Sequence, residues 1–389
     1  MYCSQTTTTA PFPSNTIHNR SASDAADMSV TEFAATTWEF LFGGNHQTPG
    51  RELPVIPVDL PHFNNENDSQ LSVTWLGHSS LMINIDGYRV MTDPVFEKRV
   101  SMLGPTRFNG EVPLEIHELP PVDAVVISHD HYDHLNKYTI ERLNAKTKLF
   151  LVPLGVGSRI IAWDIPRAKI VELDWWEEFR FDSRLIFAAT PAQHFSGRGL
   201  FDRNKTLWAS WVIKTPAHSL FFSGDSGYFD GFKAIGKKYG PFDMTFIECG
   251  AYNKSWSQIH MFPEQTVQAH LDLRGKVLHP IHWGTFNLAL HPWYEPMERL
   301  SAAARSAEVE IATPVVGDTT TYGKRIPVAR WWHQAMVQDE KISSSVQKEG
   351  PRASHPSISF PPLGGGLKYS LYCRRSRACL GGGRQREGV

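Results

Sequence analysis

The sequence predicts a layered α/β sandwich. Short apolar segments recur between residues 71 and 281, and several of them are apolar throughout, as in strands that are covered on both faces. Segments with helical apolar spacing lie between them. The chain has 389 residues, of which 41% are hydrophobic and 12% aromatic. This is enough to bury the core of one large domain or of two smaller ones.

The part of the chain before the first predicted strand divides into three segments. Residues 1–30 are rich in Thr, Ser, Asn and Pro without periodicity, which predicts a flexible leader. Apolar residues at helical spacing predict a short helix over Thr31–Gly43, and a connection with several prolines continues to Asn67. A meander of strands is then expected from Leu71, with a hairpin turn at Asp86-Gly87.

Strands and helices alternate in the remainder of the predicted domain. The segments "AVVISHD" and "KLFLVPLG" predict buried strands, and a helix is expected between them over Asn136–Ala145. Further strands are expected at Lys169–Leu173, Leu185–Ala189, Leu207–Lys214, Ser219–Ser223, Met244–Glu248 and Val277–Ile281. Further helices are expected at Phe229–Tyr239, Pro263–Leu273 and Pro296–Ala304. This order favours one sandwich domain over residues 31–333.

The composition changes abruptly near residue 334. Residues 334–389 are rich in Gly, Ser, Pro and Arg and have little apolar periodicity, so we expect a disordered tail there. Within it, residues 341–389 contain nine Lys or Arg and two Glu, a net charge of +7, whereas the rest of the chain carries −8. The tail is therefore basic, and we expect it to be solvated.

Charge and cysteine content exclude several classes of protein. A formal net charge of −1 gives no signature of polyanion binding, so a nucleic-acid partner is not expected. Four cysteines, none in a CxxC motif, do not make a disulfide framework and favour a reducing, cytoplasmic location. No stretch approaches the roughly 18 apolar residues of a membrane span, which leaves peripheral membrane attachment open.

The segment "VVISHDHYDHL" places four candidate metal ligands behind a predicted buried strand: His129, His131, Asp133 and His134. Two imidazoles two residues apart can share one metal ion. The adjacent carboxylate and imidazole can hold a second ion about 3.5–4 Å away, as in two-metal hydrolases. The alternative is a histidine-rich surface loop, but the density of the motif at a strand end favours metal binding.

Three further candidate ligands follow other predicted strands. They are His194 in "ATPAQHFSG", Asp225 in "LFFSGDSGYF" and His282 in "HPIHWGTF". Each residue alone fits a core histidine or a turn aspartate equally well. Zinc, however, prefers at least four donors, which is more than one loop supplies for two ions. Together with the first motif, these residues therefore predict one shared site.

In this order, the motifs resemble the ligand set of the metallo-β-lactamase superfamily. More narrowly, the chain resembles the N-acylphosphatidylethanolamine-hydrolysing phospholipase D family over Leu53–His333. The segments that carry this resemblance are "WLGHSS", "TDPVF", "GPTRF", "ELPPVDAVVISHDHYDHL", "VELDWWEE", "LWASW", "GPFDMTFIECGAY" and "IHWGTF". The resemblance implies an αββα four-layer sandwich with a dinuclear zinc site at one edge of the paired sheets.

The resemblance also implies which residues bind each of the two Zn²⁺ ions per chain. The implied ligands are His129, His131 and His194 for one ion, Asp133, His134 and His282 for the other, and Asp225 as the bridge. His131 stands where the di-iron redox members of the superfamily usually carry Glu. Asp225 stands where many of its β-lactamases carry Cys. Both departures favour hydrolysis by a zinc pair.

Four other residues are candidates for roles next to the metals. Tyr132 and His260, the latter in "QIHMFPEQ", match positions that contact the substrate phosphodiester in the resembled family. His260 is expected to donate a hydrogen bond or a proton to the leaving group. Asp93 in "MTDPVF", and more weakly His78 in "LGHSS", fit partners that orient a ligand side chain. Asp133 is expected to orient the nucleophile while it remains a ligand.

The function implied by the resemblance is zinc-dependent hydrolysis of N-acylphosphatidylethanolamine to N-acylethanolamine and phosphatidate. It also implies a homodimer that acts on phospholipid at the membrane surface. One alternative is a lactonase or phosphodiesterase for a small soluble substrate, and an apolar groove beside the metals would distinguish the lipid enzyme from it. A second alternative is a binding protein whose metal is structural or which uses the basic tail to dock on acidic membranes. The His/Asp ligand set without cysteine disfavours a structural metal.

Overall fold

The computed structural model describes residues 46–60, 70–102, 104–199 and 201–348. The predicted leader, the predicted helix over Thr31–Gly43 and residues 349–389 of the predicted tail lie outside this part of the chain. The described residues form two seven-stranded sheets with helices on their outer faces.

The first sheet has the strand order β14-β1-β2-β3-β4-β5-β6. Its strands are β1 Leu71–Trp75, β2 Leu81–Ile85, β3 Tyr88–Thr92, β4 Val122–Val126, β5 Thr147–Pro153, β6 Ile170–Leu173 and β14 Thr319–Thr321. The predicted meander is confirmed, because β1, β2 and β3 pair antiparallel. Strands β3 to β6 then run parallel, so their carboxyl ends share one edge of the sheet.

The second sheet has the strand order β13-β12-β11-β10-β9-β8-β7. Its strands are β7 Glu178–Arg180, β8 Ile186–Thr190, β9 Ser210–Lys214, β10 Ser219–Phe222, β11 Phe242–Glu248, β12 Gly275–Ile281 and β13 Glu310–Ile311. Strand β9 is antiparallel to both of its neighbours, and β10 to β13 are parallel. Strands β8, β10, β11 and β12 therefore all end at the same edge.

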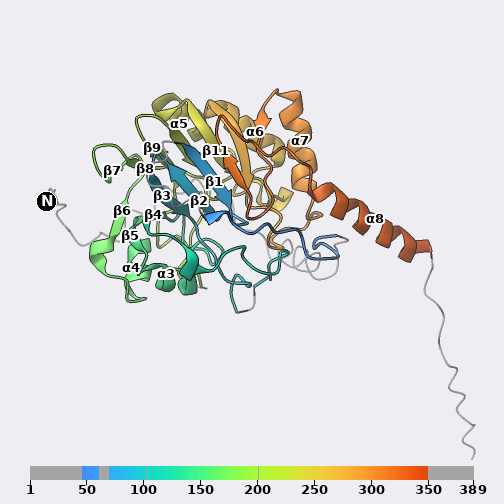
Figure 1. Cartoon of the computed structure of the whole chain (residues 1–389), viewed down its shortest axis with the longest axis horizontal. Coiled ribbons are helices and arrows are strands. Elements are labelled where there is room, and N and C mark those ends of the chain that lie inside the picture. Colours follow the sequence, from blue (N-terminus) through green and yellow to red (C-terminus); the bar gives the residue numbers. More distant parts are fainter. Residues whose placement is uncertain (1–45, 61–69, 103, 200, 349–389) are drawn as a thin grey trace, which may run out of the picture. The chain divides into compact units, whose positions relative to one another are not determined.

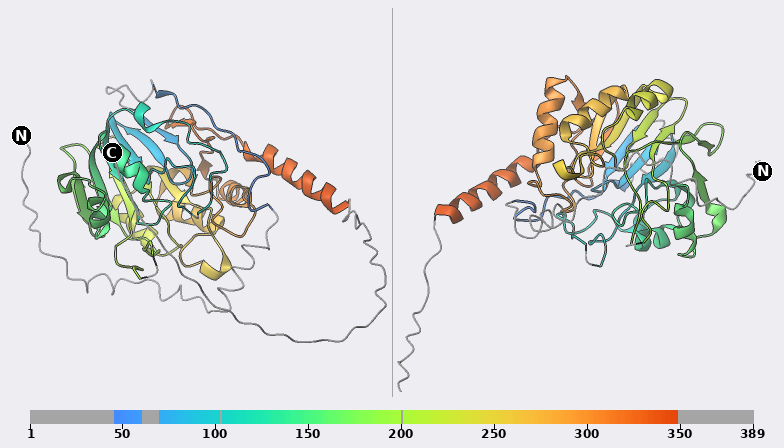
Figure 2. Two further views of the ribbon diagram at one scale, coloured as in Figure 1. Left: turned by 90° about the horizontal axis from the view of Figure 1, so that it is seen from below. Right: turned by 180° about the vertical axis from the view of Figure 1, so that it is seen from behind.

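Helices cover the outer face of each sheet, as both Figure 1 and Figure 2 show. The helices on the first sheet are α3 Lys137–Leu143 and α4 Val156–Ile161. The helices on the second sheet are α5 Gly231–Tyr239, α6 Pro263–Asp272 and α7 Glu295–Ser306. The predicted αββα four-layer sandwich is thus confirmed.

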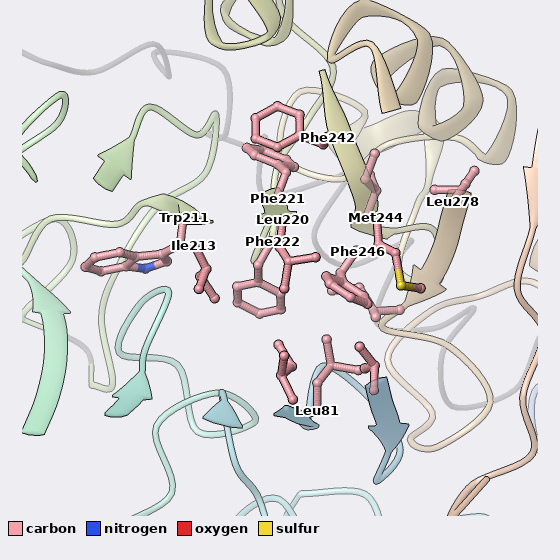
Figure 3. Packing of buried hydrophobic residues seen from close by; sticks show 14 of the residues in the cluster. Leu81, Trp211, Ile213, Leu220, Phe221, Phe222, Phe242, Met244, Phe246 and Leu278 are labelled. Atoms are coloured by element: carbon pink, nitrogen blue, oxygen red, sulfur yellow. The ribbon is translucent and has the colours of Figure 1, made fainter. Parts of the chain in front are cut away.

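The side-chain alternation of the strands divides the core into layers. Leu81 of β2 belongs to the large cluster between the sheets, whereas its neighbour Met82 packs in the cluster beneath α3 and α4. Figure 3 shows Phe222 and Phe246 of the second sheet facing Leu81 across the interior. Phe221 points the opposite way, towards α5, because successive strand residues face opposite sides.

Most predicted elements are present, with some shifted bounds. Strand β9 begins at Ser210, three residues later than the predicted start, because the preceding backbone connects to the first sheet. There the N–H of Leu207 donates to the carbonyl of Leu154 at 2.8 Å, and that of Ala209 donates to the carbonyl of Ser128 at 2.9 Å. The elements α4, β7, β13 and β14 were not predicted, since such short segments carry little periodicity.

The expected disordered tail over Gln334–Val389 is wrong at its start. Helix α8 spans Trp332–Lys348. Asp339 on this helix is buried, and its carboxylate accepts hydrogen bonds from the Trp293 indole at 3.0 Å and the Gly50 backbone at 3.1 Å. The composition of the downstream residues concealed a stretch that contains neither Gly nor Pro and is therefore compatible with a helix. Among the described residues, no helix is both long and apolar enough to cross a membrane.

Candidate metal centre

The strand directions gather the predicted donors at one edge of the sandwich. Asp93 follows β3 and His129 follows β4, two parallel neighbours in the first sheet. His194, Asp225 and His282 follow β8, β10 and β12, which share one direction in the second sheet. Residues at the carboxyl ends of strands that run the same way converge, as in other open α/β sheets. The structure brings all seven predicted ligands together here.

Local backbone geometry brings the loops close to one another. His78, Asp93 and His282 adopt positive φ angles of 53°, 36° and 63°, a region that non-glycine residues rarely occupy. Gly224 has a φ of 55°, and a Cβ on it would lie 2.4 Å from the Cβ of Ser128. Only glycine therefore lets the turn before Asp225 approach the loop after β4. Such strain is typical of functional sites.

One part of the centre is a cluster of three imidazoles, called here the three-histidine cluster: His129, His131 and His194. The distance from His131 Nδ1 is 2.8 Å to His129 Nε2 and 3.3 Å to His194 Nε2. Burial lowers the pKa of His131 to about 4 and the pKa values of the other two well below their usual range. At neutral pH all three rings are therefore neutral, the form that binds metal.

The other part is called here the aspartate–histidine cluster: Asp133, His134 and His282, whose donor atoms also lie within 4.8 Å of a ring nitrogen of His78. Asp133 Oδ2 lies 3.3 Å from His134 Nε2 and 3.4 Å from His282 Nε2. Burial opposes protonation of His282, but the charge of Asp225 and hydrogen bonds to Asp133 and Asp225 outweigh it and raise its pKa to about 10. The same two carboxylates raise the pKa of His134 well above its usual value against the effect of burial. Before metal binds, His134 and His282 are therefore protonated and positively charged at neutral pH.

The carboxylate of Asp225 lies between the two clusters. Its Oδ2 is 3.2 Å from His134 Nε2 and 3.1 Å from His282 Nε2. The same oxygen is 3.9 Å from His129 Nε2 and 3.8 Å from His194 Nε2. One carboxylate therefore reaches donors of both clusters, as a bridging ligand must.

The donor atoms of this centre fit divalent metal ions. Among the described residues, His282 Nδ1 and Asp225 Oδ1 are buried without a hydrogen-bond partner. Buried polar atoms normally have partners, and leaving them unpaired costs about 1–3 kcal/mol each. Imidazole nitrogens and carboxylate oxygens that converge in this way suit a first-row transition metal.

Asp93 and His78 lie behind the donors, as expected of orienting residues. One oxygen of Asp93 lies 2.7 Å from His134 Nδ1 and 2.5 Å from the Ser128 hydroxyl. Its other oxygen accepts from the Ser128 backbone N–H at 2.7 Å, so Asp93 orients both the imidazole and the loop. His78 Nε2 lies 2.9 Å from Asp133 Oδ2. Ser128, which was not predicted, also contacts His129 Nδ1 through its hydroxyl at 2.9 Å.

Tyr132 and His260 are the two residues expected to contact substrate. The Tyr132 side chain is 43% exposed, and its ring stacks on the Arg198 guanidinium at 3.9 Å. Arg198 also donates to the carbonyls of Asp130 and Leu135 at 2.7 Å, which holds the ligand loop in place. Arg198 was not predicted, because its role depends on contacts with residues that are distant in the sequence.

His260 is half-buried and offers a ring nitrogen within 4.8 Å of donor atoms of His194 and Asp225. It also lies within the same limit of Glu248 and His282. His260 therefore stands beside both donor clusters, as expected of a residue that contacts substrate. Glu248 was not predicted, although a glutamate that ends the otherwise mostly apolar strand "FDMTFIE" is an unusual signal.

A cleft of about 480 Å³ lies apart from these donors. Its lining comes from residues 96–117 and 138–146 and includes none of the seven predicted ligands. We therefore assign the chemistry to the donor cluster and not to this cleft.

Comparisons with known proteins agree with this geometry. A family model described as a β-lactamase superfamily domain matches residues 88–283. An uncharacterized protein of Mycobacterium tuberculosis is 45% identical over 308 residues, 77% of this chain and 81% of that one. A Caenorhabditis elegans protein named N-acyl-phosphatidylethanolamine-hydrolyzing phospholipase D 1 is 36% identical over 264 residues, 64% of this chain and 73% of that one.

The fold is also shared with solved structures. A metallo hydrolase of Ignicoccus hospitalis superposes with a TM-score of 0.52 at 20% identity, covering 66% of this chain and 100% of that one. The chain is therefore a metal-dependent hydrolase of the metallo-β-lactamase superfamily and belongs, within it, to the family that includes the N-acylphosphatidylethanolamine-hydrolysing phospholipases D.

Proposed function

We propose that this protein is a dinuclear zinc phosphodiesterase of the phospholipase D type. Its proposed substrate is N-acylphosphatidylethanolamine, and its products are N-acylethanolamine and phosphatidate. The observation that carries the proposal is the position of Asp225, whose Oδ2 lies within 3.9 Å of imidazole nitrogens from both donor clusters. Such a carboxylate suits two metal ions held side by side.

The donor set supports zinc in particular. Three imidazoles and a carboxylate on one side, and two imidazoles and two carboxylates on the other, match the nitrogen and oxygen ligands of catalytic zinc sites. When bound, such ions lower the pKa of a coordinated water and offset charge that develops on phosphoryl oxygens.

The protein's own residues then supply orientation and proton transfer. Asp133, between His134 and His282, is placed to orient the attacking water through its second oxygen while it remains a ligand. His260 donates a proton to the oxygen that leaves phosphorus. Tyr132, which lies between His131 and Asp133 in the chain and has an exposed side chain, contacts the phosphodiester.

The lipid substrate is supported by the relatives and not by the donor geometry alone. The named C. elegans relative hydrolyses N-acylphosphatidylethanolamine according to its name, and 73% of its length aligns with this chain. A membrane surface and a homodimer belong to the same proposal. A soluble ester or phosphodiester uses the same donors, so the substrate requires a direct test.

The test is turnover of N-acylphosphatidylethanolamine in detergent micelles, followed by mass spectrometry, with the zinc-loaded full-length protein. We expect release of N-acylethanolamine by the wild type. Asp225→Asn is expected to abolish it, and His260→Ala to reduce it about 10²-fold, the low end of general acid catalysis. The matched controls are Asp230→Asn and His117→Ala, since both side chains are exposed away from the donors.

Each alternative outcome has a defined meaning. No lipid turnover by protein that holds two zinc ions, together with cleavage of a lactone or a soluble phosphodiester, would move the substrate to the soluble class. Full turnover by Asp225→Asn would refute the bridging role. A loss in the control variants equal to that of the site variants would trace the effect to folding.

A further inference from the structure

Glu248 is a buried carboxylate to which the proposed reaction assigns no role. It ends β11, and its side chain is fully buried, with 0% exposure. Its Oε2 is among the buried atoms without a hydrogen-bond partner in the described part of the chain. Glutamate is almost never fully buried unless it is paired, because the charge loses its hydration. A reason for its presence is therefore needed.

The other oxygen of Glu248 contacts the segment that carries His260. Glu248 Oε1 accepts a hydrogen bond from the Met261 backbone N–H at 2.9 Å. The same oxygen lies 3.3 Å from His260 Nδ1. One carboxylate oxygen thus contacts both the ring of His260 and the backbone of the next residue.

The surrounding contacts hold this arrangement rigid. The backbone N–H of Glu248 donates to the Ser223 hydroxyl at 3.1 Å, and its carbonyl accepts from the Thr266 hydroxyl at 2.7 Å. On the other side, the carbonyl of Ile259 lies 3.0 Å from His194 Nδ1. The segment of His260 is therefore fixed between the end of β11 and a predicted metal ligand.

This geometry suits a carboxylate–imidazole pair. When Nδ1 faces a carboxylate, its proton is held there and the ring cannot rotate freely, which leaves Nε2 for the substrate. We propose that Glu248 is a positioning residue that holds His260 with Nε2 directed at the leaving oxygen of the phosphodiester. The inference rests on the proposed function, because it assigns a partner to its proton donor.

The proposed step moves one proton from His260 to the leaving oxygen. Water adds its oxygen to phosphorus and loses one proton to solvent, while the bond from phosphorus to the leaving oxygen breaks. That oxygen takes the electron pair and receives the Nε2 proton of His260. The Nδ1 proton remains on the ring beside Glu248, and solvent returns a proton to Nε2.

The first test uses two leaving groups with one set of variants. Glu248→Gln keeps the shape and an acceptor for the Met261 N–H but removes the charge. On N-acylphosphatidylethanolamine, whose alkoxide needs a proton, we expect kcat to fall about 10- to 100-fold with little change in KM. On bis(4-nitrophenyl) phosphate, whose phenolate leaves without one, we expect less than about a threefold change, as in the exposed control Glu308→Gln.

A double variant separates positioning from a general structural role. Glu248→Gln added to His260→Ala is expected to cause no further loss, because the two residues act through one proton. Equal losses on both substrates, additive effects, or loss of bound zinc from Glu248→Gln would overturn the proposal. Loss of zinc would identify Glu248 as a metal ligand, since it lies within 4.8 Å of donor atoms of His260 and His282.

The second test does not depend on the substrate. In the zinc-loaded protein labelled with ¹⁵N-histidine, His260 is expected to show a slowly exchanging Nδ1–H resonance, identified by its absence in His260→Asn. The resonance should shift or disappear in Glu248→Gln and persist in Glu308→Gln. If the wild type cleaves no lipid but shows this signal, the proposed substrate fails and the positioning role stands. An unchanged resonance in Glu248→Gln would overturn the positioning role.

Discussion

The two donor clusters lie side by side but differ in charge. In the three-histidine cluster, burial keeps the rings neutral, and the pKa of His131 falls to about 4. In the aspartate–histidine cluster, two carboxylates outweigh burial and raise the pKa of His282 to about 10. The neutral rings of the first cluster can thus accept a metal cation at neutral pH. The rings of the second cluster already carry protons where a metal cation would bind.

This difference shows that equal numbers of ligands do not make equal sites. The proximity of Asp133 and Asp225 decides whether an imidazole is neutral or protonated before metal arrives. A metal ion that enters the aspartate–histidine cluster must displace protons, and one that enters the three-histidine cluster does not. The metal affinities of the two clusters are therefore expected to depend differently on pH.

The largest effect is expected from a substitution at Asp225, the carboxylate shared by the two clusters. Asp225→Asn takes away the carboxylate that contacts both, and we expect more than a 100-fold loss of metal affinity, at least as large as the loss from removing an orienting partner. Zinc titration against a chromophoric chelator measures it. Asp230→Asn is the matched control, and retention of two tightly bound ions by Asp225→Asn would contradict the prediction.

The next effect should be unequal between the clusters. Asp93→Asn weakens the contact to His134 Nδ1, so we expect about a 10- to 100-fold loss of affinity in the aspartate–histidine cluster. The three-histidine cluster depends on Asp93 only through Ser128 and should lose less. Stepwise zinc binding measured by calorimetry separates the two events. Equal weakening of both steps would argue against two distinct sites.

A smaller effect concerns pH and the metal-free protein. Because the folded-state pKa of His282 is raised to about 10, its protonation adds stability in full below its unfolded value near 6.5. That stability is lost as pH rises from there through about 10. We expect the melting temperature of the metal-free protein to fall over this range, and His282→Gln to flatten the slope. An equal slope in both proteins would refute the assignment.

The smallest effect is expected from the basic C-terminal residues. Deletion of residues 349–389, which leaves α8 intact, should change neither zinc content nor turnover in micelles. The same deletion should be compared on anionic vesicles, where a basic segment can contribute about 1 kcal/mol per Lys or Arg near the surface. A loss of turnover in micelles would show that these residues support the centre itself.

Much of the fold could be predicted because its strands carry strong local signals. Runs such as "AVVI" and "LFLV" are apolar on both faces, and helices such as α5 have clear periodicity. The start of α8 could not be predicted, because the contacts of Asp339 with Trp293 and Gly50 join residues far apart in sequence. The short strands β7, β13 and β14 depend on pairing with neighbours rather than on their own residues.

The candidate metal centre also has residues that could be predicted from the sequence and residues that could not. The donors His129 to His134 could be predicted because they are dense in one segment, and the other three because each follows a strand. The partners Ser128, Arg198 and Glu248 could not. Their residue types are common, and only their distances to the donors reveal a role.

The sequence by itself determined which side chains are available and at which strand ends they stand, since periodicity and ligand spacing are local properties. Only the tertiary structure decided how their charges interact. The neutral and protonated clusters differ because Asp225 lies 3.1 Å from His282 but 3.8 Å from His194, and because Asp133 lies 3.4 Å from His282. Electrostatic interaction depends on distance and burial, and both are set when the two sheets pack together.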